Sequence, residues 1–470
     1  MNNVSREAYL VTPLHASRFT LMYKLILATR YLLKRRITYF AVLAVALCVF
    51  IVVVVMTVMA GLVGDFKQKN HDFTGDCVVG SESLVGFPYY EDYVDMLEAS
   101  EFVEGVSEVI RSYGLLSPQG RDLTRGVEIM GLDPARHSRA TGFGDTLHHR
   151  RDDAAKAFVP SYDPNLPGCV LGIDLALQRD SNSRYAYDSS PSRIGFSISC
   201  FPLTARGALA GAGTALANTK TFYYSDHSHS GLARVDDSII YLPFDEAQAL
   251  CGMSGQTKRI NAIHIKFKPD VKLKTGCEEA RRLWSIFKSE KANESQAYLL
   301  NTVTVQDWKL YGRALIAAME KEQMIMGVMF GFVGIVTVFI VLVVFYMLIS
   351  HKSKDIGVLR SIGVSGFDIV ELFGGFALAV GLAGSCLGVL GGWQFLLRIN
   401  SIERWLFEHF EFQVWDRTMF AIGDIPSEIS PRVLAVIVFS AIAACLIGAL
   451  VPSWQAARLK PVETLQVNQL

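Results

Sequence analysis

A short run of charged and apolar residues is the part of this 470-residue sequence best suited to bind a partner protein. Residues 351–365 read HKSKDIGVLRSIGVS and lie between two long apolar stretches. Apolar residues recur at helical spacing at Ile356, Leu359 and Ile362, and Gly363 would end such a helix. A helix of this kind can place its apolar face in a groove of another protein. The alternative is an ordinary positively charged turn between two membrane spans, and the residues alone favour neither.

Residues that could catalyse a reaction or bind a metal do not form a recognisable constellation. His227 and His229 lie near Asp226, and His148 and His149 are adjacent, but all of them fall in polar segments that we expect to be loops. The sequence has no Gly-Lys dipeptide, which a phosphate-binding loop requires. We therefore predict a protein that is not an enzyme, with no catalytic residue, metal or cofactor of its own.

Eight cysteines divide unevenly along the chain. Three fall in apolar stretches, where they are typical small apolar residues: Cys48, Cys386 and Cys445. The other five lie in the large polar segment: Cys77, Cys169, Cys200, Cys251 and Cys277. Because five is odd, at least one of them is free or pairs with another chain. One or two disulfides fit this count, and the pairing stays open.

Four apolar stretches are long enough to cross a hydrocarbon core of about 30 Å as helices. We predict membrane spans over residues 37–63, 323–350, 367–397 and 432–457. Basic residues gather in the first 36 residues, in the 351–366 loop and in the 458–470 tail, so the positive-inside rule places these three segments in the cytoplasm. The 64–322 segment and the 398–431 loop then lie outside.

Two segments beside the spans have features of a membrane surface. Residues 17–36 alternate apolar and basic positions, which favours an interfacial helix over a simple basic flank. The 398–431 loop is rich in aromatic residues, which favours the headgroup level over a binding role. These aromatic residues are Trp405, Phe407, Phe410, Phe412, Trp415 and Phe420.

The 64–322 segment has the pattern of an α+β domain, which we expect to have two lobes. Runs rich in β-branched residues predict strands at 126–131, 193–201, 238–242 and 261–267. Helical spacing predicts helices at 89–99, 244–250 and 277–288. Polar stretches at 136–166 and 179–193 are predicted loops, and the small-residue stretch at 203–220 is a predicted mobile excursion. The predicted fold is therefore an α-helical membrane protein with four spans and a large extracytoplasmic α+β domain.

The third span is rich in glycine. Gly384, Gly388 and Gly392 are four residues apart and share one face of a helix. Small residues at this spacing allow another membrane helix to approach closely. The partner helix can belong to this chain or to a second copy, and the spacing leaves both open.

At the 351–365 segment the chain resembles the permease subunits of the FtsX/MacB superfamily of ABC transporters. In that family the pattern K-x-x-D/E-I-x-x-L-R-x-x-G is a coupling helix seated on the ATPase. Six residues match it: Lys352, Asp355, Ile356, Leu359, Arg360 and Gly363. The segments EKEQM at 320–324 and VPSWQAARLKP at 451–461 also resemble the family's helix junctions.

The polar domain is most similar to that of the lipoprotein-releasing LolC/LolE branch of this superfamily. The similar segments are VEIMGLDP at 127–134, LGIDLA at 171–176 and DSIIYLPFDEAQ at 237–248. Residues 136–166 and 179–222 depart from the branch, so carrier-binding residues are not transferred, and a LolC, LolE or hybrid role stays open.

This resemblance implies a bacterial inner-membrane permease, with both termini cytoplasmic, that releases lipoproteins toward a periplasmic carrier. The implied partners are a LolD-like ATPase that binds the ATP, a second permease subunit in a homodimer or heterodimer, the lipoprotein cargo, the carrier and membrane lipid, with no nucleic acid. The alternatives are an FtsX-like mechanotransmitter that regulates cell-envelope enzymes and a MacB-like efflux permease.

Overall fold

The computed structural model describes residues 36–120, 123–179, 185–187, 191, 193–210, 216–410 and 425–458. The interfacial helix predicted over 17–36 lies outside these residues except for its last position, and so does almost all of the 458–470 tail. The described residues form two compact units, one built from the membrane helices and one from the polar segment between the first two of them. Each unit is described by itself.

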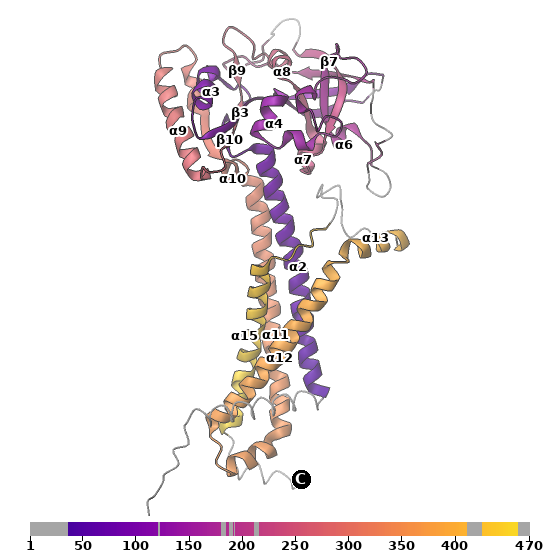
Figure 1. The fold of residues 1–470 in the computed structure, drawn as a ribbon, viewed down its shortest axis with the longest axis vertical. Coiled ribbons are helices and arrows are strands. Elements are labelled where there is room, and N and C mark those ends of the chain that lie inside the picture. Colours follow the sequence, from indigo (N-terminus) through magenta and orange to yellow (C-terminus); the bar gives the residue numbers. More distant parts are fainter. Residues whose placement is uncertain are drawn as a thin grey trace, which may run out of the picture. The chain divides into compact units, whose positions relative to one another are not determined.

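The helical unit contains four long helices: α2 (Arg36–Thr74), α11 (Arg313–Ser361), α12 (Gly366–Leu396) and α15 (Pro431–Arg458) (Figure 1). All four are long and apolar enough to cross a membrane. Two of them extend past the predicted spans, since α2 continues beyond residue 63 and α11 begins before residue 323. The polar end of α2 has no helix breaker until Gly75, which takes a left-handed conformation (φ 77°) and donates its N–H to the His71 carbonyl at 2.7 Å.

A short amphipathic helix, α13 (Ile399–Phe410), follows α12, so the segment predicted as a loop from residue 398 begins with a helix. Asn400 fixes the chain beyond it: its side chain donates to the carbonyl of Ile425 at 3.2 Å and accepts from the Ile425 N–H at 2.8 Å. Trp405 and Phe410 are exposed. The aromatic residues Phe412, Trp415 and Phe420 lie outside the described residues.

A nine-stranded sheet organises the polar domain. Its strands, in spatial order, are β11 (Val303–Asp307), β1 (Cys77–Ser81), β10 (Ala262–Phe267), β3 (Val103–Pro118), β4 (Arg125–Leu132), β8 (Ile239–Pro243), β5 (Gly168–Gly172), β7 (Asn218–Ser228) and β6 (Gly195–Cys200). The last of these, β6, also pairs with β3, so six strands from β3 to β6 close into a ring. The short strands β2 (Phe87–Pro88) and β9 (Arg259–Ile260) form a separate pair.

The long strand β3 joins the two expected lobes. Residues 103–109 pair with β10 in the open part of the sheet, whereas residues 114–118 pair with β6 in the ring. Two glycines let the backbone of neighbouring segments approach: a Cβ at Gly105 would lie 2.8 Å from the Arg139 carbonyl oxygen, and one at Gly114 would lie 2.6 Å from that of Ser199. Because these glycines interrupt the alternation of apolar and polar side chains, β3 was not predicted from the sequence.

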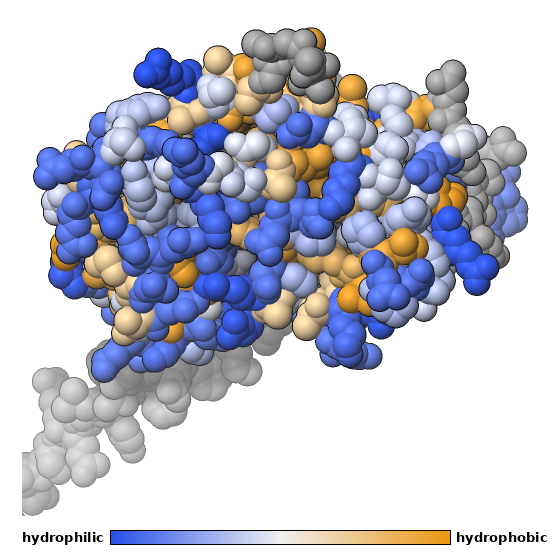
Figure 2. Space-filling model, turned by 90° about the horizontal axis from the view of Figure 1, so that it is seen from above, coloured by the Kyte–Doolittle hydropathy of each residue, from blue (hydrophilic) through white to orange (hydrophobic). Residues whose placement is uncertain are grey.

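Helices cover the sheet and complete the domain core. Helices α3 (Tyr90–Glu98) and α9 (Leu273–Glu290) pack on each other, with α8 (Phe244–Leu250) against β4. Tyr93, Trp284 and Phe287 form an aromatic cluster, and the Tyr93 hydroxyl donates to the Ala280 carbonyl at 2.9 Å. The face of the domain in Figure 2 is mostly hydrophilic, with scattered apolar side chains.

The predicted strands and helices of the domain are present, most of them with shifted bounds, but two loop predictions are wrong. Asp226 and His227 were expected in a loop and instead lie buried on β7. Within 136–166 the chain forms part of α4 (Pro134–Ala140), α5 (Phe143–Thr146) and a 3-10 turn, η1 (Ala154–Lys156). Asp133 caps α4 by accepting the Arg136 N–H at 2.8 Å, and Pro134 fits its first turn. Most of 179–193 and residues 211–215 lie outside the described residues, while 218–220 begin β7.

Candidate functional site at the junction of α11 and α12

The predicted partner-binding segment is helical, but it is the end of α11 and not a separate short helix. Helix α11 continues through Gly357 to Ser361 because no proline interrupts it, and an ion pair between Lys352 and Asp355 joins adjacent turns. Gly363, with φ 100°, ends the helix and donates its N–H to the Arg360 carbonyl at 3.1 Å. Ser365 then caps α12 by accepting the Asp368 N–H at 3.2 Å.

The apolar side chains of this segment do not all face the same way. Ile356 is only 3% exposed and belongs to the apolar core of the helical unit. Val358 and Ile362 are 48% and 76% exposed, so they are available to a partner. The side chain of Leu359 lies outside the described part of the structure. Ile356 was predicted to lie on the binding face, whereas in the structure it packs in the helical core.

Phe367 is an exposed residue that the sequence analysis missed. It occupies the second position of α12 and is 77% exposed, beside the turn that carries Ile362. A large aromatic residue directly after Ser365 and Gly366, next to a basic segment, is the signal that could have identified it. Val358, Ile362 and Phe367 are the exposed apolar residues of the junction, and we call them the junction patch.

Three helix ends meet at this junction. A Cβ at Gly366 would lie 3.3 Å from the Ala457 carbonyl oxygen at the end of α15 and 3.3 Å from Nη1 of Arg360 at the end of α11. Gly366 therefore permits close contact between α12 and α15 while the Arg360 guanidinium lies beside it. This arrangement is suited to bind a protein and to transmit a displacement to several helices.

The three predicted packing glycines lie on the face of α12 that contacts α2. A Cβ at Gly384 would lie 2.7 Å from Cγ1 of Val45, and one at Gly388 would lie 2.6 Å from the Ala46 carbonyl oxygen. At Gly392 the nearest atom would be Cγ1 of Val53, at 3.0 Å. The glycine face therefore lies against a helix of the same chain.

Two further glycines bring the remaining helices together. A Cβ at Gly381 would lie 3.3 Å from Cβ of Cys445 on α15, and one at Gly448 of α15 would lie 2.7 Å from the Val338 carbonyl oxygen on α11. Neither contact was predicted, although Gly381 lies in the glycine-rich third span. The sequence signal for this contact is a glycine within a membrane span of larger residues, where a small residue allows another helix to approach.

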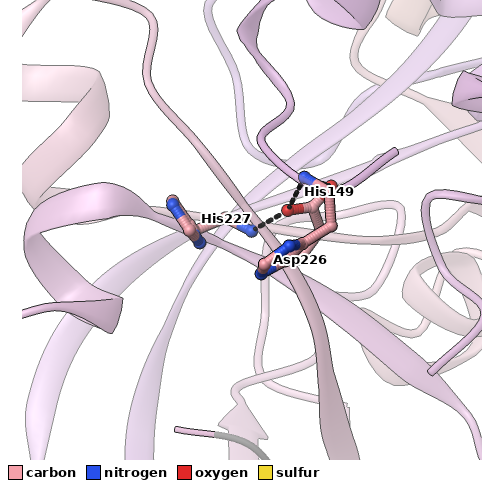
Figure 3. A group of neighbouring side chains, drawn as sticks. All are labelled: His149, Asp226 and His227. Atoms are coloured by element: carbon pink, nitrogen blue, oxygen red, sulfur yellow. Dashed lines mark hydrogen bonds between the residues drawn. The ribbon is translucent and has the colours of Figure 1, made fainter. Parts of the chain in front are cut away.

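A second group of polar side chains lies in the domain, where His149, Asp226 and His227 offer ligand atoms within 4.8 Å of one another (Figure 3). The Asp226 carboxylate accepts backbone N–H groups from His149 at 3.0 Å, Arg150 at 2.9 Å and His227 at 2.7 Å. Burial lowers the pKa of His227 to about 3, and the neighbouring His148 adds to this shift. The His227 ring is therefore neutral at physiological pH.

These contacts identify Asp226 as an anchor for the chain at residues 148–150, which it holds on β7. The His227 Nδ1 atom lies 2.6 Å from the Tyr224 hydroxyl, and its buried Nε2 atom has no hydrogen-bond partner in the described part of the chain. The three residues have the atom types to hold a divalent metal, but most of the capacity of the carboxylate is used by the backbone. The absence of a metal stays a prediction.

One family model and several known proteins are similar to this chain. Residues 327–461 match the FtsX-like permease C-terminal family, and this range covers most of α11 and all of α12, α13 and α15. The solved periplasmic region of MacB from Actinobacillus actinomycetemcomitans aligns with 54% of this chain and 97% of its own length, at 11% identity and a TM-score of 0.30. The extracellular domain of YknZ, from Gram-positive bacteria, aligns with 50% and 98%, at 10% identity and a TM-score of 0.29.

The chain carries an FtsX-like permease region over residues 327–461 and is similar to ABC transporter permeases of the bacterial inner membrane. More particularly, it is similar to the lipoprotein-releasing system transmembrane protein LolC. It is 22% identical to LolC of Xylella fastidiosa (strain Temecula1) over 431 residues, which are 91% of this chain and 92% of the relative. With LolC of Neisseria meningitidis serogroup B it shares 22% identity over 440 residues, covering 92% and 94%. The family consists of transporter subunits that work with partner components.

Proposed function

We propose that this chain is a permease subunit of an ABC transporter that releases lipoproteins from the inner membrane toward a periplasmic carrier. The observation that supports this most strongly is the extent of the likeness to LolC, which spans 91% of this chain and therefore includes the polar domain as well as the helices. A likeness confined to residues 327–461 would support only the permease class.

In this proposal, a separate LolD-like ATPase binds ATP and contacts the junction of α11 and α12 on the cytoplasmic side. The junction patch of Val358, Ile362 and Phe367 supplies the apolar contact, and Arg360 supplies charge. Lys352 and Asp355 stabilise the end of α11, and Ile356 anchors it to the helical core. Movement of the ATPase would displace α11, which is one unbroken helix from Arg313 to Ser361.

The polar domain is then periplasmic and handles the lipoprotein, and both termini are cytoplasmic. A second permease subunit and a periplasmic carrier complete the proposed transporter, and lipid surrounds the exposed apolar faces of the four helices. The chain itself contributes no catalytic step and binds no cofactor, because ATP hydrolysis belongs to the partner.

Purification from the native membrane in mild detergent tests this function. The expected result is an ATPase and diacylated or triacylated peptides in the same complex, identified by mass spectrometry, with the acylated peptides lost when ATP is added with a carrier. An ATPase found with a peptidoglycan hydrolase and no acylated peptide would favour the FtsX-like mechanotransmitter. A complex that contains a small-molecule substrate in place of lipoprotein would favour the MacB-like efflux permease.

A further inference from the structure

The cysteines of the domain are brought together in pairs by the fold. Cys200 is the last residue of β6, and Cys251 directly follows α8. Their Sγ atoms lie 3.5 Å apart although the residues are 51 positions apart in the sequence. Both side chains are buried, and the Ser112 hydroxyl is 3.3 Å from the Cys200 sulfur.

A second pair of cysteines belongs to the same core. Cys77 begins β1 and Cys277 lies in the second turn of α9. The neighbouring Cys277 thiol, together with burial, raises the pKa of the Cys77 thiol, and both residues are buried in the main apolar cluster of the domain. Cys169 on β5 is also buried in this cluster, and no contact recorded in the described part of the chain joins it to another cysteine.

We propose that the domain has two disulfide sites, Cys200–Cys251 and Cys77–Cys277, and that Cys169 remains a thiol. The proposal depends on the proposed function in one respect, since disulfides persist only where the domain lies outside the reducing cytoplasm. It accounts for the odd number of cysteines in the domain: two pairs leave one residue over. It also selects one disulfide pairing from those that the sequence left open.

Each disulfide forms by thiol–disulfide exchange with a protein or small-molecule disulfide as the oxidant. The thiolate of one cysteine attacks a sulfur of the oxidant, a mixed disulfide forms, and one thiolate of the oxidant leaves. The second cysteine loses its proton and attacks the cysteine sulfur of the mixed disulfide, which releases the other thiolate. The pair loses two protons and two electrons, and the oxidant is reduced to two thiols.

The two bonds would tie different parts of the domain. The Cys200–Cys251 bond links β6 in the closed ring to the end of α8, and the Cys77–Cys277 bond links β1 in the open part of the sheet to α9. A bond that closes a long segment stabilises mainly by limiting the unfolded chain. We expect each bond to matter most for thermal stability and little for the folded geometry.

Differential alkylation of the full-length chain, purified without reductant, tests the pairing. The unfolded protein is alkylated with iodoacetamide, reduced, alkylated with N-ethylmaleimide, and mapped by mass spectrometry. We expect Cys169 to carry the first label and the other four cysteines of the domain to carry the second, with unreduced digests linking Cys200 to Cys251 and Cys77 to Cys277. Other linkages in the unreduced digest would overturn the pairing.

A redox titration tests the cysteine pairing independently of whether the domain lies in the periplasm. The purified, reduced chain is incubated in buffers with rising proportions of oxidised glutathione, and the two pairs are expected to oxidise as pairs. If they do so while the protein trapped in intact cells is fully reduced, the pairing holds and the periplasmic placement is contradicted. If all five cysteines of the domain instead react with glutathione singly, the pairing is wrong.

Cysteine variants supply a second measurement. Cys251→Ala should lower the melting temperature of the oxidised domain by roughly 5–10 °C. The decrease in melting temperature that a reductant causes by breaking the Cys200–Cys251 bond should be absent in this variant. Cys169→Ala is the matched control, because it removes a buried cysteine without removing a bond. The proposal would be overturned if Cys169→Ala lowered the melting temperature as much as Cys251→Ala does and all variants responded equally to reductant.

Discussion

The helical unit and the polar domain achieve close packing in opposite ways. In the helical unit, glycines on α12 let the backbone of α2 approach, as at Gly384 and Gly388. In the domain, large aromatic side chains such as Tyr93 and Phe287 fill the interior.

The outer surfaces of the two units differ as well. Phe332, Phe339 and Phe439 are exposed on the helices, whereas the domain face in Figure 2 is mostly hydrophilic.

This difference follows from the solvent of each part. Lipid tails are as apolar as leucine, so burial of an apolar side chain stabilises a membrane helix pair little, and the fit of small residues decides which helices associate. In water, removal of apolar area from solvent is the main stabilising contribution. Enlarging a small residue should therefore harm the helical unit most, and shrinking a large residue should harm the domain most.

The largest effect is expected from Phe287→Ala. This ring is fully buried on α9 and packs on Tyr93 and Trp284, with ring centroids 5.5 and 5.1 Å away. Its loss leaves a cavity and should cost about 3–5 kcal/mol of the domain's free energy of unfolding. Resistance of the domain in the full chain to protease, followed as urea rises, measures this. The neighbouring Ile286→Ala is the control, because Ile286 is partly exposed, and equal losses would contradict the packing account.

Gly388→Leu should have the next largest effect, and it should destabilise the helical unit. Even a Cβ at this position would lie 2.6 Å from the Ala46 carbonyl oxygen and 2.7 Å from Cβ of Val49, so α2 and α12 must separate. We expect a cost of about 1–3 kcal/mol and a lower melting temperature in detergent. Gly375→Leu is the matched control on the same helix, since nothing lies within 4 Å of a Cβ there. A stable Gly388→Leu protein would show that the two helices do not depend on this contact.

Acidity should weaken the domain and leave the glycine contacts of the helical unit unaffected. Burial lowers the pKa of His264 to about 4 and lowers that of His137 well below its usual value. Between pH 6.5 and 4 the unfolded chain therefore binds more protons than the folded chain, so stability falls as the pH falls, by about 1.4 kcal/mol per pH unit for each histidine.

The measurement is the urea midpoint of the domain at pH 7.5, 6 and 5. His264→Asn, which keeps a donor for the Thr74 carbonyl that lies 2.8 Å from Nδ1, should reduce the slope. An unchanged slope in this variant would contradict the role of buried His264.

Much of the architecture could be predicted from the sequence because its signals are local. The four apolar stretches define the membrane helices, and the seven predicted strands and helices of the domain are present. Strand β3 escaped because Gly105 and Gly114 interrupt its alternation, and because its role depends on two partner strands far away in the sequence.

At the candidate site, the helical spacing and the terminating Gly363 could be predicted, but the direction of each side chain could not. Ile356 and Ile362 look equivalent in the sequence, yet one is buried and the other exposed. The difference depends on where α12 and α15 lie, and a pattern within one helix does not contain this information. Phe367 stands out as a large aromatic residue after a basic segment, but its exposure depends on the turn before α12 and could not be predicted.

The central claim is that the junction of α11 and α12 receives the movement of an ATPase, and Ile362→Asp tests it most directly. A carboxylate placed in an apolar contact costs several kcal/mol unless it is paired. We predict that ATP-dependent stimulation of the partner ATPase in proteoliposomes falls at least about tenfold in this variant. Leu216→Asp, an equal change at an exposed residue of the domain, should leave the stimulation unchanged. Full stimulation by the Ile362→Asp permease would contradict the account.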